Sequence, residues 1–262
     1  MSDTMPIAIT RAVSPAIARC ELTHLERTSI DAELAAAQHQ QYIETLVALG
    51  CEVHQLPAEP DLPDSVFVED TAVVLDELAI ITRPGAASRQ PETVSMAAAL
   101  ASYRPLKHIT APGTIDGGDV LRVGNRLFIG LSGRSNQAGI EQMRALLASS
   151  GYSVTGVPVR GCLHLKSAVT QVAPATLLYN PAWVDADAFR DYELIEVEES
   201  EPFGSNALLV NETIIHADHF PATRRRLEQR GLKVITVTAS ELAKAEGGVT
   251  CCSIIFKCAE ER

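Results

Sequence analysis

A cysteine, a histidine and a carboxylate far apart in the sequence could together carry out nucleophilic catalysis: Cys251, His164 and one of the acids Asp70, Asp116 and Asp119. A thiol with a pKa of ~8.5 is mostly protonated at neutral pH, so it needs a cationic or basic neighbour before it can attack. A histidine can shuttle the proton, and a carboxylate can orient the imidazole ring. The residue types alone leave an alternative open, because Cys251 and the adjacent Cys252 could simply be small buried side chains.

His164 lies in the segment LHLKS at 163–167. If this segment is a strand, its alternation places His164 and Lys166 on one face, opposite the two leucines. The alternative is a histidine of the core or the surface that has no part in catalysis.

Acidic side chains occur in two further segments. Glu69 and Asp70 follow the apolar run SVFV, and TIDGGD at 114–119 combines Asp116 and Asp119 with two glycines. Neighbouring carboxylates are costly to bury without partners, so a solvated strand end and a plain turn are the alternatives here. TIDGGD lacks the G-x-G-x-x-G pattern, which disfavours a dinucleotide site.

Two arginines take matching places between an expected hairpin and an expected helix: Arg89 in GAASR and Arg134 in LSGR. A guanidinium group suits the bidentate capture of a carboxylate. A single arginine on the surface would need no such role. Because two arginines occur at equivalent positions of the repeat, a role in ligand binding is favoured.

The elements that must position these residues repeat along the chain. The repeating unit is a β-hairpin, a helix and a strand, with a spacing of ~45 residues that is typical of closed or stacked arrays. Hairpins are expected at 68–82, 117–130 and 205–217, with weaker copies at 163–179 and 251–256. The helices that follow are expected at 93–103, 136–149 and 222–230, and the closing strands at 106–109, 152–157 and 233–237.

Equivalent places in the five copies hold Asp70, Asp119, His164, Asn206 and Cys251. Five units closed into a ring would bring these residues around one axis, whereas a simple α/β sandwich is the alternative.

The two chain ends would together complete the first unit. Its expected elements are strands at 7–10 and 52–56 and a helix that Asp31 caps and Gly50 stops. No linker divides the chain, so we expect a single domain over residues 1–262.

The chain has 262 residues with 33 acidic and 22 basic side chains, a formal net charge of −11. An acidic surface repels nucleic acid and anionic membranes, so neither is an expected partner. The basic run at 224–226 is expected to be a solvated helix face. No segment has the ~20 apolar residues of a membrane helix. The six cysteines lack zinc-finger spacing, so we expect reduced thiols, no metal site and a cytoplasmic protein.

Taken in order, these segments resemble the dimethylarginine dimethylaminohydrolase family of the guanidino-group-modifying (pentein) superfamily. The resemblance covers nearly the whole chain and implies a five-bladed α/β propeller. It rests on LPDSVFVEDTAVV at 62–74, AIITRPGAASR at 79–89, TIDGGDVL at 114–121, FIGLSGRSNQAG at 128–139, LHLKS at 163–167 and GGVTCCS at 247–253.

The resemblance implies a role for each matched residue. Cys251 would be the nucleophile and His164 the general acid and base, oriented by Asp116. Asp70, with Glu69 nearby, would hold the substrate guanidinium group. Some family members have Glu in place of Asp116. The resemblance therefore does not decide whether the shorter Asp116 side chain reaches His164.

The resemblance further implies that Asp64 and the backbone of Leu22 bind the substrate α-amino group, and that the loop around Leu22 acts as a mobile lid. Arg89 and Arg134 would bind the α-carboxylate. Cys252 and Glu246, the latter in KAEGG just before the nucleophile, receive no role.

The implied reaction is hydrolysis of asymmetric dimethylarginine and monomethylarginine to L-citrulline and dimethylamine or methylamine, through a covalent thiouronium on the cysteine. It needs no metal or organic cofactor, and zinc at the Cys/His site would inhibit it. The alternatives are an arginine deiminase-like hydrolase, which the short chain disfavours, and a non-catalytic binding or regulatory protein on the same scaffold. A methylated arginine is the expected partner, and either a monomer or a homodimer is compatible with the sequence.

Overall fold

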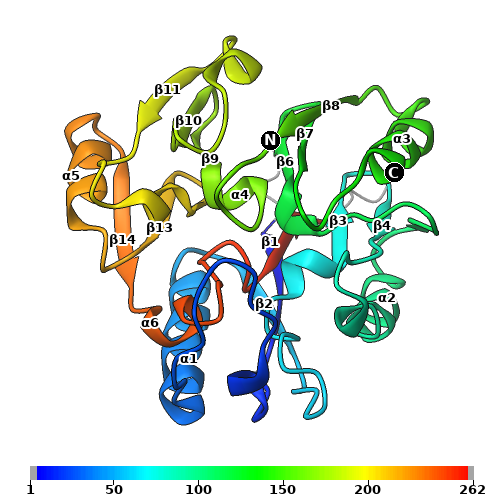
Figure 1. Ribbon diagram of the computed structural model, residues 1–262, viewed down its shortest axis with the longest axis horizontal. Helices are drawn as coiled ribbons and strands as arrows, with labels where there is room; N and C mark the ends of the chain where they lie inside the picture. Colours follow the sequence, from blue (N-terminus) through cyan, green and yellow to red (C-terminus); the bar gives the residue numbers. More distant parts are fainter. Residues whose placement is uncertain (1–4, 259–262) are drawn as a thin grey trace.

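The computed structural model describes residues 5–258, which form five three-stranded sheets around a common centre (Figure 1). This arrangement is a five-bladed α/β propeller and rules out the sandwich alternative. The strands are β1 Pro6–Arg11, β2 Glu52–Leu56, β3 Ala72–Val74, β4 Ala79–Ile81, β5 Leu106–His108, β6 Val120–Val123, β7 Arg126–Leu131, β8 Ser153–Pro158, β9 Val169–Ala173, β10 Thr176–Tyr179, β11 Glu193–Glu196, β12 Ala207–Val210, β13 Thr213–Ala217, β14 Lys233–Val237 and β15 Ile254–Lys257.

Each sheet repeats one topology, in which the middle strand pairs antiparallel with one neighbour and parallel with the other. The antiparallel pair is the expected hairpin, and the parallel strand follows the crossover. The sheets are β3-β4-β5, β6-β7-β8, β9-β10-β11, β12-β13-β14 and β15-β1-β2.

The last of these sheets joins the two ends of the chain, as the repeat predicts. β1 pairs antiparallel with β15, with Ile9 opposite Ile254 and Pro6 opposite Lys257. Figure 1 shows the two strands side by side, in blue and red. The ring is therefore closed by hydrogen bonds between the first and last strands.

The helices that connect the parallel strands lie on the outer side of the ring (Figure 1). Asp31 caps the first of them as predicted, because its side chain accepts hydrogen bonds from the backbone of Glu33 and Leu34. In the β9-β10-β11 sheet a 3₁₀ turn, η5 Ala186–Phe189, replaces the crossover helix. The helices are α1 Ala32–Ala48, α2 Glu92–Leu100, α3 Gln137–Leu147, α4 Leu165–Ala168, α5 Pro221–Gln229 and α6 Ser240–Ala243.

A short turn precedes the first strand of every sheet and faces the centre of the ring. Four of these turns are helical, and the fifth, at 249–252, leads into β15. The five residues placed by the repeat lie in or beside these turns. The helical ones are η2 Val68–Thr71, η4 Gly117–Asp119, α4, and η6 Pro202–Ser205.

The strand expected at 163–167 is wrong. His164 is extended but forms the N-cap of α4, so Lys166 lies in a helical turn and not beside His164 on a strand face. The cause is a tertiary contact, since the Asp119 carboxylate accepts a hydrogen bond from the Leu165 N–H at 2.9 Å. An acidic group at that position favours a helix start.

Apolar side chains pack between neighbouring sheets, while the centre of the ring is polar. One cluster, for example, joins Ile80 on β4 to Ile129 on β7 and Met143 on α3. By contrast, Asp116 and Asp119 at the centre have no exposed surface. Buried charges are costly, so these must be offset by partners.

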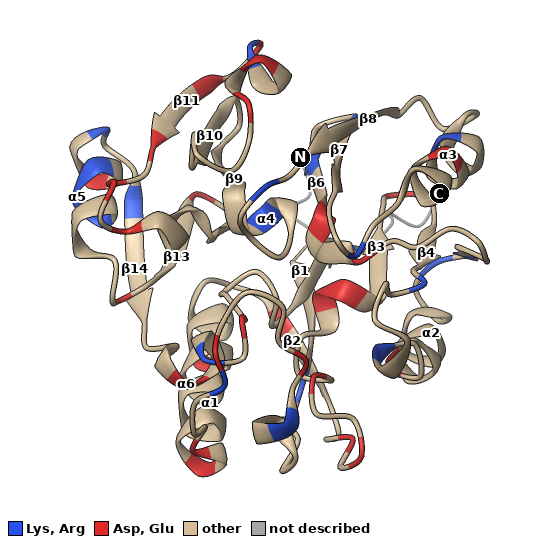
Figure 2. Cartoon of the chain, in the orientation of Figure 1, with Lys and Arg blue, Asp and Glu red and all other residues tan. Residues whose placement is uncertain are grey.

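The outer surface carries the basic run at 224–226. Arg225 is exposed, and Arg224 and Arg226 pair with Glu228 and Glu198, which confirms a solvated helix face on α5 (Figure 2). Within residues 5–258, no helix combines the length and apolar character needed to cross a membrane.

Candidate active site

A cavity of about 10 Å³ lies among the inward-facing turns, with room for about one water molecule. Six of the nine residues predicted for the site line it: Asp64, Asp70, Arg89, Arg134, His164 and Cys251. The other three, Asp116, Glu69 and Leu22, do not line it. Asp116 contacts the lining residue His164, and the Glu69 N–H donates to the carbonyl of the lining residue Cys251. Leu22 follows Glu21, which does line the cavity.

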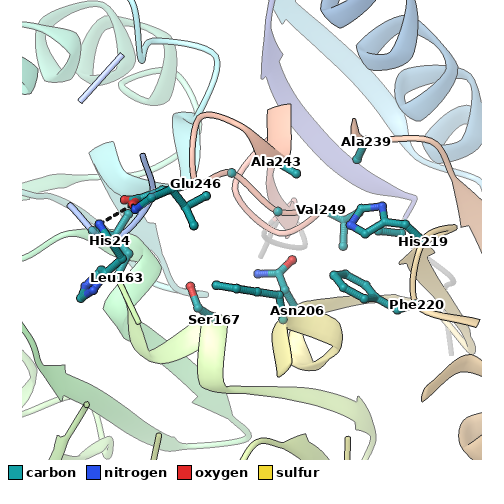
Figure 3. Close-up of a pocket in the computed structure, with 15 residues that line it drawn as sticks. His24, Leu163, Ser167, Asn206, His219, Phe220, Ala239, Ala243, Glu246 and Val249 are labelled. Atoms are coloured by element: carbon teal, nitrogen blue, oxygen red, sulfur yellow. Dashed lines mark hydrogen bonds between the residues drawn. The ribbon is translucent and has the colours of Figure 1, made fainter. Parts of the chain in front are cut away.

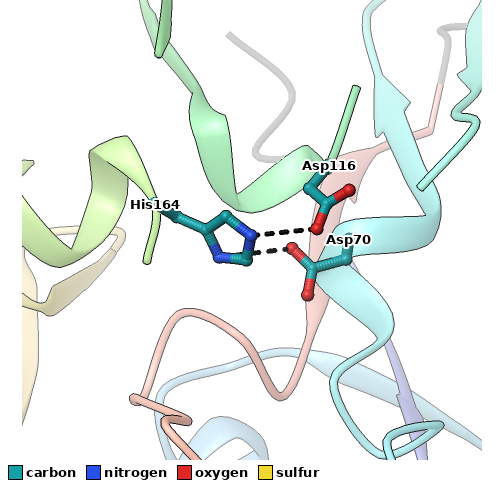
Figure 4. A group of neighbouring side chains, drawn as sticks. All are labelled: Asp70, Asp116 and His164. Atoms are coloured by element: carbon teal, nitrogen blue, oxygen red, sulfur yellow. Dashed lines mark hydrogen bonds and ion pairs between the residues drawn. The ribbon is translucent and has the colours of Figure 1, made fainter. Parts of the chain in front are cut away.

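His164 is held between two carboxylates (Figure 4). Its Nε2 lies 3.0 Å from an Asp116 oxygen, and its Nδ1 lies 3.8 Å from Asp70. Burial alone would lower the pKa of His164, but the charges of Asp70, Asp116 and Asp119 raise that pKa to about 9. The ring is therefore protonated at neutral pH and can act as an acid. The shorter side chain of Asp116, compared with Glu, reaches the ring.

Asp116 is itself held in place by backbone and side-chain donors. Gly85 donates its N–H to Oδ1 at 2.8 Å, and the Asp116 N–H donates to Ser135. One carboxylate oxygen is thus fixed by the backbone and the other is left for His164.

Asp70 accepts hydrogen bonds from Arg89 at 2.5 Å and from the Gly118 N–H at 2.9 Å. Burial alone would raise the pKa of Asp70, but the positive charges of His164 and Arg89 lower it to about 2. The group is therefore a carboxylate that can attract a cation.

Arg89 is buried, and carboxylates and carbonyls occupy most of its donors. Besides Asp70 it contacts Glu92, through Nε at 3.0 Å and Nη2 at 2.8 Å, and the carbonyls of Asp64 and Phe67. Burial raises the pKa of Glu92 to about 7, against the opposing charge of Arg89. The sequence analysis missed Glu92, which its i,i+3 spacing from Arg89 could have indicated.

Glu69 is buried too, in contrast to the solvated alternative. Lys166 donates to one oxygen at 2.5 Å and the Thr250 hydroxyl to the other at 2.9 Å. Asn206 bonds both the Thr250 N–H and the Lys166 carbonyl, which ties these partners together. Burial raises the pKa of Glu69 although Lys166 opposes the change.

Cys251 lines the cavity with its thiol beside the backbone. The Gly248 N–H lies 3.3 Å from Sγ. Burial, and then the negative charges of Glu69 and Asp70, raise the pKa of Cys251 to about 12. The thiol is therefore neutral at neutral pH.

Cys252 lines a different small cavity, together with His39 and Tyr42 of α1. Burial raises its pKa well above the ordinary value, and its Sγ lies 3.6 Å from the Gly248 carbonyl. The adjacent thiols thus face different sides of the turn, and only Cys251 lines the cavity that contains His164.

Arg134 is 8% exposed, and its Nη1 has no hydrogen-bond partner among residues 5–258. Its Nη2 donates to the Thr23 hydroxyl at 3.1 Å, and Nη1 lies 3.8 Å from Asp116. A buried, unsatisfied guanidinium nitrogen is costly without a partner, which makes this atom a candidate for binding an anion.

Asp64 contacts the loop at 20–29, which covers the cavity. The Glu21 N–H donates to Asp64 at 3.0 Å, and burial raises the pKa of Asp64 although Arg89 opposes the change. Leu22 is half-buried against the apolar cluster beneath the loop.

Gly118 packs against two side chains of the site. The sequence pattern indicated no role for it beyond a turn. A Cβ atom at this position would lie 2.6 Å from His164 Nδ1 and 2.7 Å from Asp70 Oδ1. The two side chains pack directly on the glycine backbone, so a larger residue would displace them.

Asp70, Asp116 and His164 place possible ligand atoms within 4.8 Å of one another. Arg89 and Gly118 already contact the Asp70 oxygens, and Cys251 is outside this group. The expected inhibition by zinc at Cys251 and His164 stays a prediction.

The chain is similar to known proteins over most of its length. The sequence model of the arginine deiminase family matches residues 57–196 and 190–256. The chain is 39% identical to N(G),N(G)-dimethylarginine dimethylaminohydrolase of Streptomyces coelicolor over 249 residues, which are 94% of this chain and 95% of that protein.

Two solved structures of dimethylarginine dimethylaminohydrolase superpose closely. One is the Pseudomonas aeruginosa protein, as a cysteine-to-serine mutant complexed with citrulline, with a TM-score of 0.92 and 34% identity over 97% of this chain and all of that chain. The other is a histidine-to-glycine variant as its adduct with S-methyl-L-thiocitrulline, with a TM-score of 0.91 and 35% identity over 96% of this chain and all of that chain.

Proposed function

We propose a reaction for this chain from the fact that it belongs to the dimethylarginine dimethylaminohydrolase family. The reaction is hydrolysis of Nω-methylated L-arginines, asymmetric dimethylarginine and monomethylarginine, to L-citrulline and dimethylamine or methylamine. One observation carries the proposal. A neutral thiol, a protonated imidazole and an ionised carboxylate meet at a single buried cavity.

Binding is proposed to place the guanidinium group against Asp70, with Glu69 behind it. Arg134 would bind the α-carboxylate through its unsatisfied Nη1. Asp64 and the Leu22 backbone would bind the α-amino group. Most donors of Arg89 are occupied, so we propose that it mainly orients Asp70 and adds one Nη1 hydrogen to the carboxylate site.

The bound cation would also activate the nucleophile. Glu69 and Asp70 contribute to the raised pKa of Cys251, and a guanidinium group placed beside them offsets their charges. The thiol then loses its proton to solvent, and the thiolate attacks the central guanidinium carbon. The C–N bond to the methylated nitrogen breaks as His164 protonates the leaving amine.

The second half of the reaction would use the same histidine. His164, now neutral, takes a proton from water, which attacks the thiouronium carbon. The C–S bond breaks, citrulline leaves, and the cysteine and the imidazolium are restored. These steps need no metal or organic cofactor, and we propose that residues 1–262 act as one catalytic domain.

The family model names a second candidate activity, arginine deiminase, which would act on unmethylated arginine. Citrulline release from asymmetric dimethylarginine and from arginine separates the two. We expect turnover of the methylated substrate to exceed that of arginine. Equal or faster turnover of arginine favours the deiminase, and no turnover of either favours a binding protein.

The choice of nucleophile is tested by a pair of adjacent substitutions. Cys251→Ser is expected to abolish turnover, and Cys252→Ser to leave most of it, because only Cys251 lines the cavity with His164. An amidine inactivator should add to Cys251 in a mass spectrum. The opposite pattern would assign the chemistry to Cys252.

A further inference from the structure

Glu246 has a backbone conformation that side chains rarely adopt. Its φ is 59°, in the left-handed region where glycine is usual. The residue lies at the C-terminal end of α6. There the Gly247 N–H donates to the Leu242 carbonyl at 3.0 Å, and the Glu246 N–H donates to the Ala243 carbonyl at 3.1 Å. This is a Schellman cap, whose left-handed position favours glycine. A glutamate in this strained position indicates a function for its side chain.

The Glu246 carboxylate accepts hydrogen bonds from three successive backbone N–H groups of the loop at 20–29. The distances to Oε1 are 3.1 Å from Thr23, 2.5 Å from His24 and 2.6 Å from Leu25. Figure 3 shows the bond to His24. Three N–H dipoles converging on one anion form a strong, charge-assisted contact between distant parts of the chain.

Two further hydrogen bonds of this loop use side chains that we propose for substrate binding. Asp64 accepts the Glu21 N–H, and Arg134 donates to Thr23. An entering amino acid would compete for both side chains, whereas Glu246 has no part in the proposed substrate contacts. It can therefore hold the loop whether or not the site is occupied.

Glu246 also separates two cavities. On one side is the closed site of about 10 Å³, which cannot admit an arginine unless the loop moves. On the other is a largely apolar pocket of about 250 Å³, walled by Phe203, Phe220 and Val249 and by His24 and Leu25 of the loop (Figure 3). The loop thus lines both cavities, through Glu21 on one side and through His24 and Leu25 on the other, and movement of the loop would open both.

We propose that Glu246 is a latch that holds Thr23, His24 and Leu25 in the closed position and so sets the fraction of molecules ready to retain substrate. It is a positioning residue that acts through the loop. The identity of the substrate that it would help retain rests on the proposed function, whereas the contact between Glu246 and the loop does not.

Limited trypsin digestion of the full chain without ligand tests the latch directly, because Arg27 in the exposed loop is a cleavage site. Glu246→Gln keeps the side-chain length and removes the charge, and Glu246→Gly relieves the backbone strain as well. Both are expected to speed cleavage after Arg27 about tenfold, since hydrogen bonds to a charged acceptor are lost. Glu246→Asp, which keeps the charge, should give an intermediate rate.

Asn211→Gly is the matched control. Asn211 is the other non-glycine residue at positive φ within residues 5–258, and its side chain bonds the Leu49 carbonyl, outside this loop. We expect no change in cleavage after Arg27 for this variant. Cleavage of both the Gln and the Gly variant at the wild-type rate would overturn the latch.

Kinetics with asymmetric dimethylarginine provide the second measurement. A smaller closed fraction weakens apparent binding, so Glu246→Gln should raise KM more than it lowers kcat. A fall in kcat at unchanged KM would contradict the latch and indicate a part in the chemistry. If the wild-type protein turns over no methylated arginine, the proposed function fails while the digestion experiment still decides the latch.

Discussion

The imidazole of His164 and the carboxylate of Asp116 form one buried pair, with 3.0 Å between Nε2 and Oδ2 and no exposed surface on Asp116. Asp116→Asn keeps the size of the side chain but removes its charge and can present an N–H to the ring. The pKa of His164 should fall below about 9, and kcat should drop about 10²-fold or more, as for loss of a general acid.

NMR titration of the His164 ring and steady-state kinetics measure these two effects. Asp76→Asn, the same change at an exposed carboxylate that pairs with Arg122, serves as the control. An Asp116→Asn enzyme with nearly wild-type kcat would mean that the pair does not orient the ring for catalysis.

Protonation of His164 should stabilise the fold, because the pKa of about 9 exceeds the ordinary 6.5 of the unfolded chain. The contribution is fully present below pH 6.5 and is lost as the pH rises through 9. The unfolding free energy of the wild type should exceed that of His164→Gln by a margin that shrinks by about 3 kcal/mol over this range.

Urea unfolding of both proteins at several pH values gives that margin. His108→Gln, at an exposed histidine on β5, is the matched control substitution. A margin that grows with pH would mean that His164 is neutral in the folded protein.

Removing the charge of Glu69 should make Cys251 more reactive while lowering turnover. Burial, Glu69 and Asp70 raise the pKa of the thiol, so Glu69→Gln lowers that pKa and leaves the Lys166 cation nearby. We expect iodoacetamide to alkylate Cys251 several-fold faster at neutral pH, consistent with more thiolate. Turnover of the cationic substrate should fall, since one of its carboxylates is gone.

Mass spectrometry of the alkylated protein follows the first effect, and citrulline release the second. Glu198→Gln, which removes the charge of a partly exposed glutamate paired with Arg226, should change neither. Slower alkylation in Glu69→Gln would show that the carboxylate does not suppress the thiolate.

Gly118→Ala should damage the site through shape alone. The new methyl group would lie 2.6 Å from His164 and 2.7 Å from Asp70, so both must move. We expect a loss of about 1–3 kcal/mol in unfolding free energy, typical of overpacking, together with a large fall in kcat. Gly133→Ala is the control, because a Cβ there would meet nothing within 4 Å. Equal stability and activity for the two variants would contradict the packing argument.

The ring of five units could be predicted from sequence because each unit is local. Hairpin turns, helix caps such as Asp31, and crossover strands all lie within a few tens of residues, and their spacing repeats. The pairing of β1 with β15 could be predicted because each end of the chain carries one incomplete unit.

The interior of the site could not be predicted in the same way, because it depends on contacts between units. The start of α4 at Leu165 is set by Asp119, and the partners of Arg89 include Asp70 and Glu92. The sequence pattern alone predicted neither the contact of Asp119 with Leu165 nor the partners of Arg89. The left-handed conformation of Glu246 was also hidden, since two glycines follow it and would have been the expected choice.

Cys251 lies three residues before β15, the strand that pairs with β1 from the other end of the described chain. The strand that closes the ring and the thiol that the reaction needs therefore arrive together, and such a long-range pairing forms slowly. A nascent or truncated chain that ends before β15 could contain His164, Asp116 and Asp70 in folded units and still lack both closure and nucleophile. Activity is thus expected to begin only once β15 has been made and has paired with β1.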